Sequence, residues 1–115
     1  MKINVREIGD VAVVTVVGNI LQEYVSLFRS RLGDLIERGK IRIILDMADS
    51  SYISSLCLAV IIDTKNKTSA SGGDVKIANA NQLVRNLLEI TNLNRKIEMY
   101  DTIEAAQTSF GSPQQ

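Results

Sequence analysis

The first third of the chain changes from an alternating apolar pattern to a helical one. Lys2–Glu7 alternates apolar and polar residues, and Val11–Val17 is rich in the β-branched residues that favour strands. The Gly9-Asp10 pair between them is typical of a tight turn, so the two runs are predicted to form a hairpin. Over Glu23–Arg38, apolar residues recur every three or four positions, which predicts an amphipathic helix.

The rest of the chain alternates short apolar runs with segments of helical periodicity. Strands are predicted over Ile41–Leu45, Asp74–Ala78 and Ile97–Tyr100, and helices over Leu56–Ala70, Asn81–Ile90 and Ile103–Phe110. The order ββαβαβαβα predicts a single α/β domain whose mixed sheet is mostly parallel, with an antiparallel N-terminal strand. We assign this domain to residues 1–110 and expect residues 111–115 to form a flexible tail.

The charge balance argues against nucleic acid as a partner. Thirteen Lys and Arg residues balance thirteen Asp and Glu residues, whereas proteins that hold phosphate backbones usually carry a basic excess. No apolar stretch approaches the roughly 20 residues that cross a bilayer, and residues 1–10 lack the pattern of a signal peptide. We therefore expect a cytoplasmic protein without nucleic-acid or membrane partners.

The chain lacks the side chains on which many enzyme and metal sites depend. It has no histidine and one cysteine, Cys57, which excludes the usual zinc spacings and a Cys–His nucleophile pair. It also has no glycine-rich phosphate loop. Asp46 follows a predicted strand, where α/β sheets tend to carry function, and we interpret it either as a polar residue that caps the end of the strand or as a group that orients the neighbouring serine loop. These features predict a binding protein rather than an enzyme, with no cofactor and no metal.

Several short strings, spread over almost the whole chain, match one known family in order and spacing. The strings are Val13–Gly18, Ile43–Asp46, Tyr52–Val60, Leu87–Leu93 and Asp101–Ala106. Together with the element order, they resemble the STAS domain, the fold of bacterial anti-sigma factor antagonists. The resemblance implies a signalling protein that regulates transcription by partner switching.

The resemblance also implies a phosphorylation site at the start of a helix. In that family the serine directly after an aspartate is the phosphoacceptor, and the matching position is Ser55, with Ser54 as the alternative. The implied partners are an anti-sigma factor serine kinase, which binds the unphosphorylated form, and a serine phosphatase. A phosphoryl group adds roughly −1.5 to −2 charges, enough to disrupt an apolar interface, while the helix dipole tolerates it.

The string around the two serines departs from the family pattern. Ser54 stands where the family has aspartate, Leu56 where it has serine or threonine, and Cys57 and Ala59 where it has glycine. Leu21 likewise replaces an aspartate after the second strand. Either serine could instead serve only as a helix cap, and Cys57 is interpreted as a small buried apolar residue.

These positions predict a partner surface and leave two further functions open. If Leu56 and Val60 form an exposed apolar helix face, the chain could be a structural STAS subunit that is never phosphorylated. Such a subunit would assemble with itself, even weakly, or with a larger signalling complex; binding of a small apolar ligand is the third reading. The predicted partner-binding residues are Asn19, Leu21, Asp46, Ser54, Ser55, Leu56, Cys57 and Val60.

Overall fold

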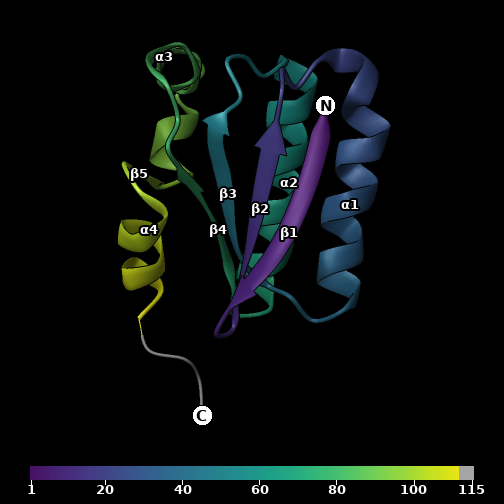
Figure 1. Cartoon of the computed structure of the whole chain (residues 1–115), viewed down its shortest axis with the longest axis vertical. Coiled ribbons are helices and arrows are strands. Elements are labelled where there is room, and N and C mark those ends of the chain that lie inside the picture. Colours follow the sequence, from purple (N-terminus) through teal and green to yellow (C-terminus); the bar gives the residue numbers. More distant parts are fainter. Residues whose placement is uncertain (112–115) are drawn as a thin grey trace.

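The computed structural model describes residues 1–111, which form a five-stranded mixed sheet and four α-helices (Figure 1). The strands are β1 (Lys2–Ile8), β2 (Val11–Val17), β3 (Arg42–Asp49), β4 (Asp74–Ala78) and β5 (Met99–Tyr100). The helices are α1 (Val25–Glu37), α2 (Ser55–Ala70), α3 (Gln82–Ile90) and α4 (Ile103–Phe110), with 3₁₀ turns at Gln22–Tyr24 and Leu93–Arg95. The predicted α/β class and element order are confirmed. Within residues 1–111, no helix has both the length and the apolar character needed to cross a membrane.

The strand order explains why one edge of the sheet collects the loops that matter for function. Strands β1 to β5 lie side by side in chain order. The β1–β2 pair is antiparallel across the turn at Gly9, whose φ of 61° suits glycine, and the other neighbours are parallel. Because parallel strands end at the same edge, the loops that follow β2, β3 and β4 meet at the top of Figure 1.

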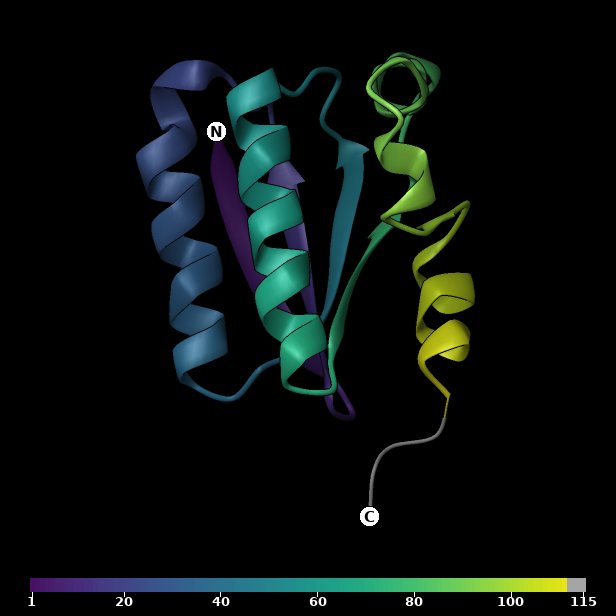
Figure 2. The same cartoon turned by 180° about the vertical axis from the view of Figure 1, so that it is seen from behind.

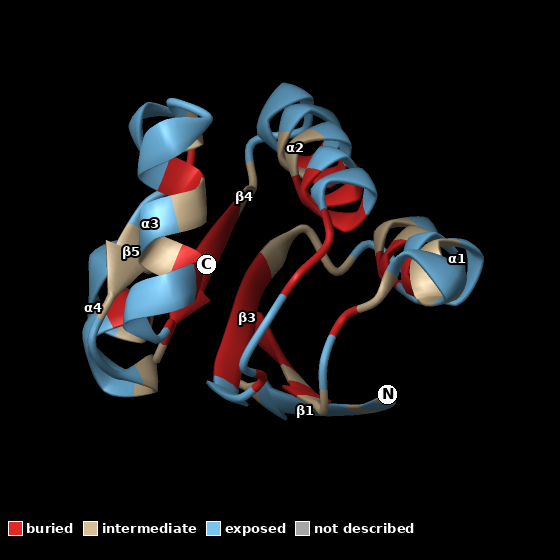
Figure 3. Cartoon of the chain, turned by 90° about the horizontal axis from the view of Figure 1, so that it is seen from above, coloured by how far each residue is buried: buried red, intermediate tan, exposed pale blue. Residues whose placement is uncertain are grey.

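The helices divide between the two faces of the sheet. Helices α1 and α2 lie side by side over one face, and α4 packs against β3 and β4 on the other (Figures 2 and 3). Strand side chains alternate accordingly: Leu45 and Met47 join the larger core under α1 and α2, whereas Ile44 joins the smaller core under α4. Phe28 of α1 and Ile61 of α2 are fully buried in the larger core.

Three element boundaries differ from the sequence prediction by two residues or more. Strand β3 continues to Asp49, so Asp46 lies within the strand rather than beyond its end. The helix predicted from Glu23 begins at Val25, after a 3₁₀ turn, and β5 covers only Met99–Tyr100. Of the predicted tail, residues 112–115 lie outside the described part of the chain.

A buried lysine attaches α4 to the sheet. The Nζ atom of Lys76 in β4 donates to the Ser109 hydroxyl at 2.7 Å and lies 4.5 Å from the centre of the Phe110 ring. It also lies 2.9 Å from a carboxylate oxygen of Glu98, to which the Tyr100 hydroxyl donates. Hydrogen bonds from Lys76 and then Tyr100 hold the pKa of Glu98 below its ordinary value.

The turn between α2 and β4 has no room for a side chain at Gly73. A Cβ atom there would lie 2.0 Å from the carbonyl oxygen of Ile41, which already accepts the Asp74 N–H at 2.9 Å. We expect Gly73→Ala to lower the free energy of unfolding by about 3 kcal/mol, because backbone must move to admit the methyl group.

Urea denaturation of Gly73→Ala beside Gly33→Ala tests this expectation. A Cβ at Gly33, inside α1, would meet no atom within 4 Å. Gly33→Ala should therefore leave stability unchanged or raise it by about 0.5–1 kcal/mol, since alanine favours helix. Equal midpoints for the two variants would show that the turn relaxes without cost.

Candidate partner-binding site

Two loops at the upper edge of the sheet are joined like a short pair of parallel strands (Figure 1). The Ile20 N–H donates to the carbonyl oxygen of Tyr52 at 2.8 Å, and the Ser54 N–H donates to that of Ile20 at 2.8 Å. Ile20 and Ile53 pair as an isolated bridge, and both side chains are buried. These contacts fix the loop after β2 against the loop after β3, and so position the start of α2.

Asn81 connects α3 to the same loops. Its side-chain nitrogen donates to the carbonyl oxygen of Ser51 at 3.1 Å, while its side-chain oxygen caps α3 by accepting the Val84 N–H at 2.9 Å. The buried hydroxyl of Ser50 donates to the carbonyl oxygen of Val16 at 2.8 Å. These hydrogen bonds hold the ends of β2 and β3 and the start of α3 together, next to the loop that leads into α2.

Ser54 and Ser55 are adjacent but have different surroundings. Ser54 is the N-cap of α2: its hydroxyl oxygen accepts the Cys57 N–H at 3.3 Å, and only 6% of the residue is exposed. Ser55 is the first residue of α2 and is exposed. The hydroxyl of Ser54 is therefore used for capping, whereas Ser55 is open to solvent.

The start of α2 is a favourable place for negative charge. The first backbone N–H groups of a helix have no acceptor within the helix, and its dipole is positive at that end. The first turn of α2 contains no acidic residue. A phosphoryl group on Ser55 would thus meet backbone donors without repulsion from a carboxylate in the same turn.

Three large apolar side chains are exposed on α2, on the loop that leads into it and on α3. The exposed fraction is 46% for Leu56 in α2, 38% for Tyr52 in the preceding loop and 49% for Leu83 in α3. The hydrogen bond from Asn81 to Ser51 joins α3 to the loop that carries Tyr52. With their polar neighbours, these side chains form a surface that we call the serine face. The serine face consists of Asn19, Leu21, Tyr52, Ser55, Leu56 and Leu83.

Two further residues of the predicted partner-binding set lie in the core of the protein. Cys57 is fully buried, with its sulfur 3.7 Å from the carbonyl oxygen of Leu21, and Val60 is 2% exposed. Helix α2 therefore presents Leu56 but not Val60 to solvent, so the two residues do not form a shared exposed apolar face. The buried Ser54 likewise contributes little surface.

Asp46 also lies away from the serine face. It is 7% exposed and points toward the α4 side of the sheet, because its neighbours Leu45 and Met47 point toward α1 and α2. Its carboxylate accepts hydrogen bonds from the Thr15 hydroxyl at 3.1 Å and the Asn79 side chain at 2.9 Å. Asp46 therefore ties β2 and the loop after β4 to β3, which corrects its predicted place beside the serines.

Sequence reasoning did not assign Tyr52, Asn81 or Leu83 to the site. Asn81 carried a usable signal, because asparagine directly before a helical run is a typical N-cap. No sequence signal distinguished Leu83 from the buried apolar residues of α3, since its exposure depends on how that helix packs.

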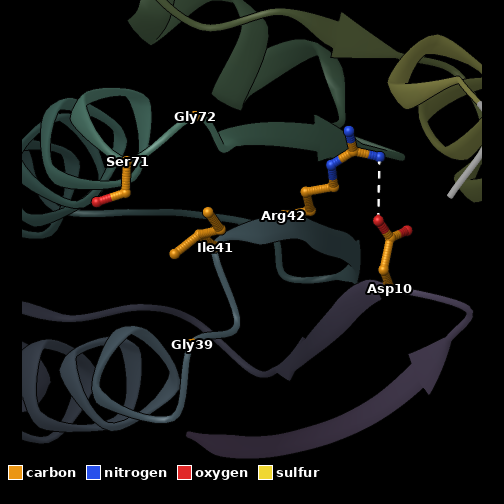
Figure 4. Close-up of a pocket in the computed structure, with 6 residues that line it drawn as sticks. All are labelled: Asp10, Gly39, Ile41, Arg42, Ser71 and Gly72. Carbon is orange, nitrogen blue, oxygen red and sulfur yellow. Dashed lines mark ion pairs between the residues drawn. The ribbon is translucent and has the colours of Figure 1, made fainter. Parts of the chain in front are cut away.

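A pocket at the opposite edge of the sheet offers no comparable chemistry. Asp10, Gly39, Ile41, Arg42, Ser71 and Gly72 line it (Figure 4). The Arg42 guanidinium and the Asp10 carboxylate pair at 3.2 Å, so each charge is already matched. In the described part of the chain, no three Cys, Asp or Glu residues gather as a metal site would require. The serine face is therefore the candidate functional site.

A small α/β domain with an exposed serine among apolar side chains has the form of a protein-binding module, and comparison with known proteins identifies its family. The STAS domain model matches residues 2–106, and the chain belongs to the STAS domain family. A Thermotoga maritima protein named "Putative anti-sigma factor antagonist" is 34% identical over 85 residues, which are 73% of this chain and 75% of that protein.

Solved structures agree with this assignment. A crystal structure with the same name and organism superposes with a TM-score of 0.89 at 29% identity, over 93% of this chain and 92% of that chain. The anti-sigma factor antagonist SpoIIAA in its unphosphorylated form gives a TM-score of 0.76 at 16% identity, over 96% and 100% of the two chains. The phosphorylated form of SpoIIAA, from Bacillus, gives 0.74 at 17% identity, over 95% and 99%.

Proposed function

We propose that this chain is an anti-sigma factor antagonist that acts as a partner switch through the serine face. The unphosphorylated chain binds an anti-sigma factor serine kinase and thereby frees a sigma factor. Phosphorylation of Ser55 releases the kinase, and a serine phosphatase restores binding. The observation that carries the proposal is the exposed Ser55 at the first position of α2, beside the exposed Leu56.

The surroundings of the two serines favour Ser55 as the phosphoacceptor. A kinase must bring the acceptor hydroxyl into line with a nucleotide phosphate, which requires an accessible oxygen. Ser55 meets this requirement, whereas the Ser54 hydroxyl is buried and caps α2. Phosphorylation of Ser54 would also remove the hydroxyl cap of α2, and such a cap typically contributes about 1 kcal/mol to the free energy of unfolding.

The switch follows from charge at an apolar interface. Binding energy in protein interfaces concentrates in a few apolar or aromatic side chains that lose their water, and Tyr52, Leu56 and Leu83 are suited to that role. A phosphoryl group on Ser55 would need to be stripped of water in their midst, which opposes docking. The chain itself remains folded, because the positive end of α2 stabilises the new charge.

Two properties of related proteins support this proposal. The Thermotoga maritima relative carries the name of an anti-sigma factor antagonist. SpoIIAA has been solved with and without its phosphate, and both forms share the fold of this chain, so the fold accommodates a phosphorylated state.

The alternative of an unphosphorylated structural subunit would use the same exposed apolar side chains. Because Val60 is buried, α2 has no apolar face that extends beyond Leu56 to Val60. The two functions differ in one respect. A structural subunit would assemble without any dependence on the charge at Ser55, whereas the partner switch depends on it.

Replacement of Leu56 by aspartate tests the proposed docking face. We expect Leu56→Asp to weaken binding to the purified anti-sigma factor kinase by about thirtyfold, or roughly 2 kcal/mol, because it places an unpaired charge in the interface. Isothermal titration calorimetry measures the affinity. Leu27→Asp is the matched control, since Leu27 in α1 is 44% exposed, against 46% for Leu56, but lies outside the serine face. Equal affinities for the two variants would contradict the proposal.

A further inference from the structure

Strand β1 has one unpaired edge, exposed over most of its length (Figure 3). The pair that closes the two-residue turn, Ile8 and Val11, is hydrogen bonded, and bonding alternates along an antiparallel ladder. The N–H and C=O groups of Ile3, Val5 and Glu7 therefore point away from β2, toward the free edge. Such an edge can accept a further strand.

A groove runs along this edge, between β1 and the last turns of α1. Val5 and Leu35 provide its apolar floor. Val5 is 43% exposed, whereas valines in strands commonly pack against a neighbouring side chain. Leu35 of α1 is buried. An apolar floor beside unpaired backbone groups suits a peptide in extended conformation, which presents a side chain to the floor at every second residue.

The rim of the groove is basic. Lys40 and Glu7 form an ion pair across one end of the groove. Within residues 1–111, the three arginines of the rim have no carboxylate within 4.0 Å. This local excess occurs in a chain whose net charge is zero. The charged residues that line the groove are Arg6, Glu7, Arg31, Asp34, Arg38 and Lys40.

We infer that the β1 edge and this groove bind an extended acidic segment of a partner protein, which adds to the sheet as a further strand. Backbone pairing with Ile3, Val5 and Glu7 supplies the register. On the side of the segment that faces α1, an apolar side chain meets the floor and neighbouring carboxylates on the same side pair with Arg31 and Arg38. The groove lies near the C-terminal end of α1, at the opposite end of the molecule from the serine face, so this inference does not depend on the proposed function.

Other occupants fit the groove less well. A second copy of the chain paired through β1 would bring two sets of unpaired arginines together, and like charges across neighbouring strands are unfavourable. A nucleic acid would match the arginines but would leave the edge amides and the apolar floor unused. The acidic peptide matches all three features.

A labelled peptide tests the inference on the whole chain. The probe is the seven-residue peptide Thr-Glu-Thr-Val-Thr-Glu-Thr with a terminal fluorophore, which presents Val and both Glu side chains on one side of the strand. Its binding is measured by fluorescence anisotropy at low salt. We expect Arg31→Glu, Arg38→Glu and Val5→Pro each to weaken binding at least tenfold. Val5→Pro removes an N–H that faces the free edge, and proline is tolerated at such positions. Arg95→Glu, in the exposed turn after α3, should leave the affinity unchanged.

Two altered peptides separate strand addition from simple ionic attraction. The same peptide with Lys in place of both Glu residues should not bind, and the original peptide N-methylated at alternate residues should bind at least tenfold more weakly. Equal affinity of the N-methylated peptide, or full affinity of Arg31→Glu, would overturn the inference. So would displacement of the peptide by an oligonucleotide, or sedimentation showing a dimer that Val5→Pro dissociates. If Val5→Pro fails to fold by circular dichroism, the exposed arginine variants still decide the outcome.

Discussion

Replacing Ser55 with aspartate is expected to weaken binding to the anti-sigma factor kinase by about a hundredfold, or roughly 2.8 kcal/mol. The substitution puts a carboxylate on the serine face, directly beside Leu56, where docking would strip it of water. The fold should be unaffected, because an acidic residue in the first turn of a helix is stabilising. Surface plasmon resonance with immobilised kinase measures the affinity, and thermal unfolding confirms that the variant is folded.

Ser54→Asp is a close control, because it adds the same charge one residue earlier. Aspartate is a good N-cap, so this carboxylate should turn inward and accept the Cys57 N–H as the serine does. We expect Ser54→Asp and Ser55→Ala to keep affinity within about threefold of the unmodified chain. If Ser55→Asp binds as tightly as Ser55→Ala, the serine face is not a charge-operated switch.

Replacing Phe28 with alanine is expected to lower the free energy of unfolding by about 3–5 kcal/mol. Phe28 is fully buried in the core between α1 and the sheet, so its removal leaves a cavity as well as less buried apolar surface. Domains of this size are stable by only about 5–15 kcal/mol. The melting temperature should therefore fall by more than about 12 °C, as measured by differential scanning calorimetry.

The adjacent Leu27→Ala provides the comparison for Phe28→Ala. Leu27 occupies the same helix but is 44% exposed, so its truncation should cost less than about 1 kcal/mol. Similar melting temperatures for the two variants would mean that α1 does not pack on the sheet through Phe28.

Much of the fold could be predicted because its apolar periodicity is local. Val11–Val17 reads as a strand and Leu56–Ala70 as a helix from neighbouring residues alone, and both lie close to the observed elements. The end of β3 could not be found in this way. Residues after Leu45 include turn formers, but the ladder with β2 resumes at Val17 and Asp49 after an irregularity, and this pairing extends the strand.

The candidate site could be located in sequence only in part. The resemblance to a known family pointed to Ser54 and Ser55, and the difference between them emerged from the cap geometry of α2. Burial separated Val60 from Leu56, although both are apolar residues of one helix. Leu83 joins the same surface only because tertiary contacts bring α3 beside the loop after β3.

The two surfaces also differ in how salt should affect them. Binding at the serine face depends on apolar contacts, and these are weakened little by a moderate salt concentration. Binding along the β1 edge depends on exposed arginines, whose attraction weakens as the Debye length shortens from about 10 Å at 0.1 M salt. This contrast allows the two interactions to be told apart in one preparation.

The most direct test of the central claim is intact-mass spectrometry of the protein purified from its native cells, followed by peptide mapping across residues 53–63. The partner-switch account predicts a population carrying one phosphoryl group, located on Ser55, whose fraction changes with growth or stress conditions. Absence of phosphate under all such conditions, or its location only on Ser54, would contradict the account.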